Sequence, residues 1–115
     1  MRKKLPRLAL LLASLFVLAG VSEAHPAKDM VLTMENGLLG VMASHGVSDG
    51  KEHYIRYFTV RIGGEMIYRL EASRQPDRND AMGLFYLGTL KKGTVVDVET
   101  ECSRSGTLRK SITVK

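Results

Sequence analysis

Apolar and polar residues alternate with a period of two through most of the chain after residue 24. In the clearest case, Phe58, Val60 and Ile62 alternate with Thr59 and Arg61. Such alternation places every second side chain on one face of a β-strand, as expected when only one face is buried. Runs of this kind predict seven strands, at residues 30–34, 38–43, 54–62, 65–70, 81–87, 94–102 and 107–114.

Short turn motifs separate the predicted strands. Asn36-Gly37 and Gly63-Gly64 are two-residue hairpin signals, and Gly93 follows two lysines between the fifth and sixth strands. No segment after residue 24 has a convincing helical period. Seven short strands with regular turns predict an all-β fold, an immunoglobulin-like antiparallel β-sandwich of about seven strands.

The residue pattern at positions 1–24 predicts a signal peptide rather than part of the folded domain. Basic residues precede an uncharged apolar run at residues 8–19, and Ser22 and Ala24 are small residues at the two positions that signal peptidase reads. The apolar run is shorter than the ~20 residues that span a bilayer. We therefore expect cleavage after Ala24, a periplasmic or secreted protein, and no stable membrane anchor after cleavage.

Charge and length narrow the classes of function. The whole chain carries a formal net charge of +5. The leader contributes four basic residues and one acidic residue, so residues 25–115 carry a net charge of +2. A charge this small does not predict a nucleic-acid partner. The length after cleavage predicts one small domain at residues 25–115.

Cys102 is the single cysteine of the chain, which excludes an internal disulfide. A lone thiol in an exported protein can be a metal ligand, one half of an intermolecular bridge, or a buried inert group. A small domain without a disulfide has a low free energy of unfolding, and a bound metal would raise it.

Two histidines and this cysteine all lie at the ends of predicted strands. His45 follows the second strand, His53 lies where the third begins, and Cys102 ends the sixth. A sandwich could bring these ends together at one pole, where loops on a rigid scaffold often carry function. Imidazole and thiolate together suit iron, zinc or copper. The alternative is histidines exposed in a loop and a cysteine that is a small buried apolar group.

His25 would be the first residue after cleavage. Its free amine and its ring nitrogen could then bind one metal together, an arrangement that suits copper, with His45 or His53 as a further ligand. The alternative is a frayed terminus without a ligand role, because first residues are often poorly ordered.

The pattern of these residues resembles a known family. His45, then His53-Tyr54-Ile55, then Cys102 with Gly106 four residues later, are similar to the iron-binding domain of desulfoferrodoxin and superoxide reductase. Ala24-His25-Pro26 resembles the start of small exported members, which lack the rubredoxin-like module. The resemblance extends from His25 to the end of the chain.

The resemblance implies properties that spacing alone does not. It implies an immunoglobulin-like sandwich and one iron (Fe2+/Fe3+) with His45, His53, Cys102 and His25 as ligands. It also implies oxidoreductase chemistry on superoxide, with electrons from a donor that the sequence does not identify. Catalytic residues stay unassigned.

The chain also departs from the family pattern. Ser105 stands where the family has a ligand histidine, and Gly46 stands where a proline follows the first histidine. The family's amino-terminal Glu-Lys-His segment is absent, which leaves Lys28 and Lys51 as substitutes for its lysine or as ordinary surface residues. The family site uses four histidines and one cysteine, whereas this chain has three histidines.

Three functions therefore stay open. The first is a superoxide reductase-like oxidoreductase with an incomplete ligand set. The second is a non-catalytic metal-binding or electron-transfer module, and the third is a sandwich that has lost its metal.

Overall fold

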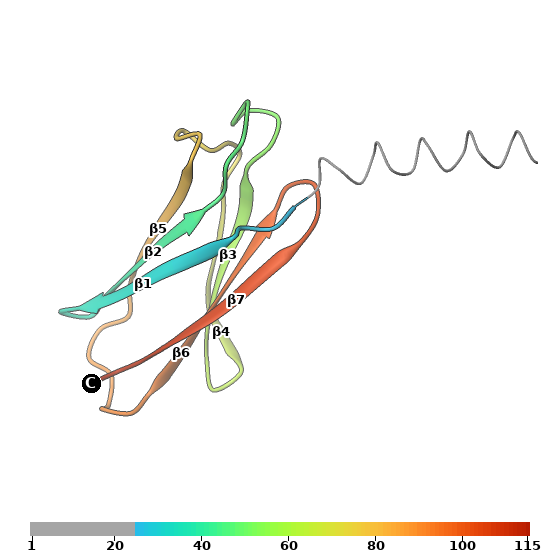
Figure 1. Cartoon of the computed structure of the whole chain (residues 1–115). Coiled ribbons are helices and arrows are strands. Elements are labelled where there is room, and N and C mark those ends of the chain that lie inside the picture. The colour runs from blue at the N-terminus through green and yellow to red at the C-terminus, as the bar shows by residue number, and fades with distance from the viewer. Residues whose placement is uncertain (1–24) are drawn as a thin grey trace, which may run out of the picture.

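The computed structural model describes residues 25–115 (Figure 1). The predicted signal peptide at residues 1–24 lies outside the described residues. The described part of the chain forms seven strands and no helix, so none of its segments is a helix long and apolar enough to cross a membrane. The strands are β1 (Asp29–Glu35), β2 (Leu38–Ser44), β3 (Ile55–Ile62), β4 (Glu65–Glu71), β5 (Asp80–Tyr86), β6 (Val95–Cys102) and β7 (Thr107–Thr113).

The strands form two packed antiparallel sheets. One sheet has three strands in the order β1-β2-β5, and the other has four in the order β4-β3-β6-β7. Figure 1 shows the two layers facing each other along their length. The prediction of an all-β sandwich of about seven strands is confirmed, and each predicted strand boundary agrees with the structure to within one residue.

The turn residues explain two of the hairpins. Asn36 and Gly37 have φ angles of 51° and 78°, and Gly63 and Gly64 have φ angles of 59° and 81°. Positive φ at both central residues is what a type I′ turn requires, and the twist of this turn matches that of the strands it joins. The turns therefore set the register of β1 with β2 and of β3 with β4.

The hydrophobic core lies between the two sheets and packs them against each other. Alternate residues of β3 and β6 point inward, and Phe58 is among the largest fully buried side chains. Burying a side chain of this size contributes roughly 1.5–3 kcal/mol relative to leaving it exposed. Other buried apolar residues are Ala27, Met30, Leu39, Val41, Ala43, Ile55, Val60, Ala81, Phe85, Val96 and Val98.

Candidate metal centre

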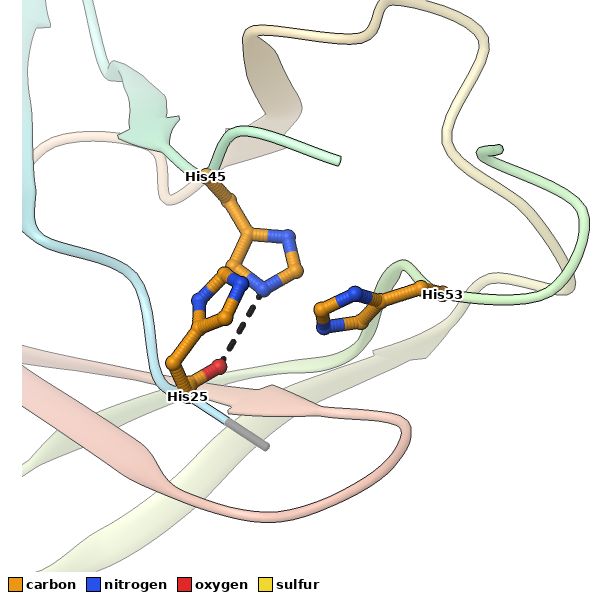
Figure 2. Close-up of side chains that lie close together, drawn as sticks. All are labelled: His25, His45 and His53. Atoms are coloured by element: carbon orange, nitrogen blue, oxygen red, sulfur yellow. Dashed lines mark hydrogen bonds between the residues drawn. The ribbon is translucent and has the colours of Figure 1, made fainter. Parts of the chain in front are cut away.

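The three histidines and the cysteine meet at one pole of the sandwich. His45 follows the end of β2, His53 precedes the start of β3, and Cys102 is the last residue of β6. His25 lies just before β1, whose first residue pairs with the last residue of β2. Figure 2 shows the imidazoles of His25, His45 and His53 pointing toward one another from three segments. The expectation that strand ends bring these residues together is met.

The three imidazoles are close enough to serve one metal ion. One ligand atom from each of His25, His45 and His53 lies within 4.8 Å of the others. The ring centroids are 4.6 to 4.8 Å apart. Nitrogen atoms bound to one metal at about 2.1 Å would lie roughly 3–4 Å apart. Small rotations of the side chains would therefore bring all three into coordination distance.

Cys102 contacts this histidine cluster through His53. Its Sγ lies 3.1 Å from Nε2 of His53, and the residue is 3% exposed. A sulfur and a nitrogen that bind one metal at right angles, at about 2.3 and 2.1 Å, would be roughly 3.1 Å apart. A hydrogen bond between a thiol and an imidazole has a similar length. The distance between these two atoms therefore suits a metal bound by both or a hydrogen bond without one, whereas the group of donor atoms within 4.8 Å of one another comprises the three histidines.

The site is buried except on the side of His25. His45 is 1% exposed and His53 is 8% exposed, whereas His25 is half-buried. A hollow of about 610 Å³ opens beside His25 and His45, and Lys28 and Asp80 also line it. A small ligand would approach the histidines through this hollow. Lys51 instead lines a different hollow, next to Gln75.

The segment that carries His25 is held in place by two contacts. Lys28 N donates to the carbonyl of Ser44 at 2.8 Å. Pro26 packs against Gly106, where an added Cβ would lie 2.8 Å from the proline ring. Gly106 has a φ of +99°, which also favours glycine there. Because this turn directly follows Cys102, the two contacts hold His25 at the same pole as His45 and His53.

Ser105 occupies a different environment from the cluster. It is exposed in the turn between β6 and β7, whereas Cys102, three residues earlier, is buried. The position that the resemblance assigns to a ligand histidine is therefore at the surface of this protein.

Gln75 is a site residue that sequence reasoning missed. It lies in the loop between β4 and β5, is 4% exposed, and its Oε1 is 2.9 Å from Nδ1 of His45. The loop at residues 73–80 is polar throughout most of its length. A single glutamine in such a loop gives no sequence signal of burial or of contact with a histidine.

Comparisons with known proteins concern the fold. No family model matches the chain, and no curated protein matches its sequence. A hypothetical protein from Pyrococcus horikoshii superposes with a TM-score of 0.52 and 17% identity, over 76% of this chain and 84% of the other. A superoxide reductase in the oxidised state superposes with a TM-score of 0.49 and 20% identity, over 76% of this chain and 86% of the other. At 17% identity, the likeness to the Pyrococcus protein concerns the fold alone.

Proposed function

We propose that the protein binds iron through His25, His45, His53 and Cys102 and acts as an oxidoreductase on superoxide. The observation that supports this proposal is the convergence of three imidazoles, two of them buried, with Cys102 Sγ 3.1 Å from His53 Nε2. Imidazole and thiolate ligands suit iron, and they also suit copper or zinc. The choice of iron rests on the resemblance of His53-Tyr54-Ile55 and Cys102 to the desulfoferrodoxin family.

Each side chain has a role in this proposal. His45 and His53 hold the metal from buried positions, and His25 closes the site on the side of the hollow. The thiolate of Cys102 would donate electron density to a bound metal and so tune its reduction potential. Lys28 adds a positive charge to the hollow, which offsets the negative charge of Asp80 there and favours the approach of an anion.

The chemistry requires partners that the chain does not contain. Reduction of one superoxide to hydrogen peroxide consumes one electron and two protons. A bound iron would supply the one-electron step, and a separate one-electron donor would restore its reduced state. We propose that this reaction occurs in the periplasm or outside the cell, after removal of residues 1–24.

A second candidate function is electron transfer or metal binding without catalysis. The burial of His45, His53 and Cys102 favours this second function. An electron can be transferred to a buried metal even when no substrate can reach the metal. The three histidines of the chain also fall short of the family's four. Rapid superoxide consumption without dismutation supports the reductase, and a redox-active metal that leaves superoxide untouched supports the second candidate.

Metal content and spectroscopy test the proposal. The protein is purified without a metal-affinity resin, loaded anaerobically with Fe2+ and then oxidised. We expect one iron per chain and a visible thiolate-to-iron charge-transfer band, which Cys102→Ser removes. Ser105→Ala, a change at an exposed neighbour of Cys102, serves as the matched control and keeps the band. Equal spectra and equal metal content in wild-type protein and Cys102→Ser would refute the shared site.

The mass of the exported protein tests the processing step. We expect a mature chain that begins at His25, because Ser22 and Ala24 match the positions that signal peptidase reads. A start well downstream of His25 would remove one of the three histidines from the proposed ligand set.

A further inference from the structure

Gln75 joins the two loops that surround His45. Its backbone N–H donates to the carbonyl of Gly50 at 2.9 Å. A Cβ on Gly50 would lie 1.9 Å from the carbonyl oxygen of Gln75, so glycine is required for this approach. His45 N donates in turn to the carbonyl of Asn79 at 2.9 Å. The side chain of Gln75 is therefore held between loops that are themselves bonded together.

Three backbone contacts fix the orientation of the Gln75 amide. Its Nε2 donates to the carbonyl oxygens of His45 at 2.7 Å and of Asp77 at 2.9 Å. Its Oε1 accepts from the backbone N–H of Ile55 at 3.3 Å. Carbonyl oxygens only accept and an N–H only donates, so a flipped amide would lose all three bonds. The amide oxygen must therefore face His45 Nδ1.

This orientation determines which nitrogen of His45 carries the proton. Nδ1 of His45 is 2.9 Å from Gln75 Oε1, which is an acceptor. Nδ1 must therefore be the donor, because both N–H groups of the amide are already used. In the neutral ring, Nε2 is then left with a lone pair, and it is the nitrogen on the side of His25 (Figure 2).

We infer that Gln75 is a positioning residue, which holds the proton of His45 on Nδ1 and directs the Nε2 lone pair into the histidine cluster. The use of that lone pair as a metal ligand rests on the proposed function. Histidines that bind metals commonly donate their other N–H to a fixed acceptor, which sets the ring orientation. Gln75 supplies such an acceptor without adding a negative charge.

A second contact lies at the other ring nitrogen and, taken alone, would favour a proton there. Nε2 of His45 lies 3.3 Å from the carbonyl oxygen of His25. With the proton on Nδ1, this contact brings two lone pairs together, unless a cation lies at the nitrogen. A metal ion bound at Nε2 would remove this repulsion. The proton is assigned to Nδ1 because its acceptor, Gln75 Oε1, is 2.9 Å away, whereas His25 O is 3.3 Å from Nε2.

The direct test is the tautomer of His45 in metal-free wild-type protein. Long-range 1H–15N correlation spectra of protein labelled with 15N-histidine distinguish the two neutral forms at mildly alkaline pH, where imidazoles are neutral. We expect the Nδ1–H form for His45. Observation of the Nε2–H form overturns the inference, whatever the protein's affinity for metals.

Variants of the loop separate hydrogen bonding from loop order. Gln75→Leu removes the acceptor, so we expect a changed tautomer ratio and roughly 10- to 100-fold weaker Zn2+ binding. Asp77→Ala is the matched control. Asp77 Oδ1 orders the same loop by accepting from the backbone of Asn79 and Asp80, at 2.7 and 3.1 Å. We expect this control to keep the His45 tautomer and to bind Zn2+ within about threefold of wild type.

The outcomes distinguish this inference from the proposed function. A folded Gln75→Leu variant with an unchanged tautomer overturns the inference, and so does an Asp77→Ala variant that loses as much Zn2+ affinity as Gln75→Leu. A wild-type protein with the Nδ1–H form that binds neither Fe2+ nor Zn2+ supports the role of Gln75 and refutes the metal site. Should Gln75→Leu fail to fold, the wild-type spectrum alone decides.

Discussion

The two poles of the sandwich differ in chemistry more than in shape. The pole with His25, His45, His53 and Cys102 has a hollow of about 610 Å³. The opposite pole, where β1 and β7 end, has a larger hollow of about 830 Å³. Among the described residues, the lining of this larger hollow includes no histidine, cysteine, aspartate or glutamate. The convergence of nitrogen and sulfur donor atoms, rather than the volume of a hollow, therefore identifies the candidate site.

The largest expected effect is on the free energy of unfolding, which a metal bound at the pole with the histidines and Cys102 should raise. A ligand present at 1,000 times its Kd adds about 4 kcal/mol to the free energy of unfolding. We expect Fe2+ to raise the Tm of wild-type protein under anaerobic conditions and to leave the Tm of His53→Ala unchanged. Thermal unfolding with and without Fe2+ is the measurement.

A variant of the opposite pole is the control for that experiment. Ile112 lines the larger hollow, and Ile112→Val should lower stability by about 0.5–1.5 kcal/mol. The shift in Tm caused by Fe2+ should nevertheless equal that of wild-type protein. If Fe2+ changed the Tm of His53→Ala and of Ile112→Val by the same amount, the metal would not bind specifically at the pole that carries His53.

A change between the poles should affect stability and leave metal binding intact. Thr100 is fully buried on β6, two residues before Cys102, and within residues 25–115 its hydroxyl has no hydrogen-bond partner. Replacement by the isosteric valine should raise the free energy of unfolding by about 1 kcal/mol. Urea denaturation measures this change. A loss of stability, or weaker metal binding, would mean that the hydroxyl contributes to the site.

Two lysines allow a test of the hollow itself. Lys28 lines the hollow beside His25, whereas Lys51 lies elsewhere. If the protein reduces superoxide, Lys28→Met should lower the second-order rate constant for the reaction with superoxide about threefold at low salt, because the variant lacks one charge that attracts the anion. Lys51→Met should change the rate less. Pulse-generated superoxide and stopped-flow detection give both rates, and equal rates would exclude a role for the Lys28 charge.

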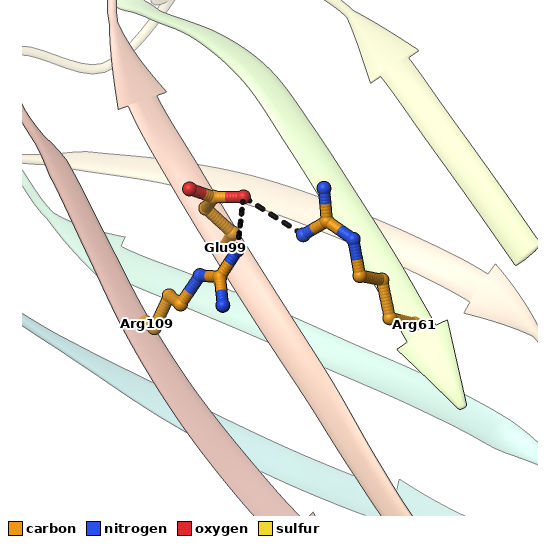
Figure 3. Close-up of polar contacts among 3 residues, drawn as sticks. All are labelled: Arg61, Glu99 and Arg109. Atoms are coloured by element: carbon orange, nitrogen blue, oxygen red, sulfur yellow. Dashed lines mark hydrogen bonds and ion pairs between the residues drawn. The ribbon is translucent and has the colours of Figure 1, made fainter. Parts of the chain in front are cut away.

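The smallest expected effect lies on the outer face of the four-stranded sheet, away from both poles. Figure 3 shows Glu99 between Arg61 and Arg109, at 2.8 and 3.4 Å. The hydrogen bond from Arg61, with a further contribution from Arg109, lowers the pKa of Glu99. Glu99→Gln should therefore reduce stability near neutral pH by about 0.5 kcal/mol.

The pH dependence of this effect follows from the direction of the shift. A carboxyl group with a lowered pKa in the folded state stabilises the fold above its unfolded pKa, and the stabilisation is lost as the pH falls through the folded pKa. The difference between wild-type protein and Glu99→Gln should therefore vanish in acid. Denaturation curves across this range test it, and a difference that persists in acid would contradict the electrostatic cause.

Much of the fold is predictable because its signals are local. Alternation with a period of two determines which face of a strand is buried, and Asn36-Gly37 and Gly63-Gly64 supply the positive φ angles of tight turns. One local feature escapes this reasoning. Simple alternation places Met66, Tyr68 and Leu70 on one face, but a register shift pairs Met66 with Arg61 and Tyr68 with Val60. Met66 is therefore on the opposite face from Tyr68.

The candidate site is only partly predictable because its contacts are long-range. His45, His53 and Cys102 could be placed at strand ends from the strand pattern alone. The position of His25 depends on the packing of Pro26 against Gly106, which are 80 residues apart in the sequence. The role of Gln75 depends on hydrogen bonds between two loops, which leave no pattern in composition or spacing.

The separation of the ligands along the chain sets an order of events during folding. His25 and Cys102 are 77 residues apart, and they precede β1 and end β6, respectively, so the packing of the two sheets brings them to the same pole. Contacts between distant residues form late, because the entropy of closing long loops must be overcome first. The unfolded chain offers only His45 and His53, eight residues apart, as neighbouring nitrogens. A complete set of donor atoms therefore exists only in the finished fold, and metal uptake would follow folding rather than guide it.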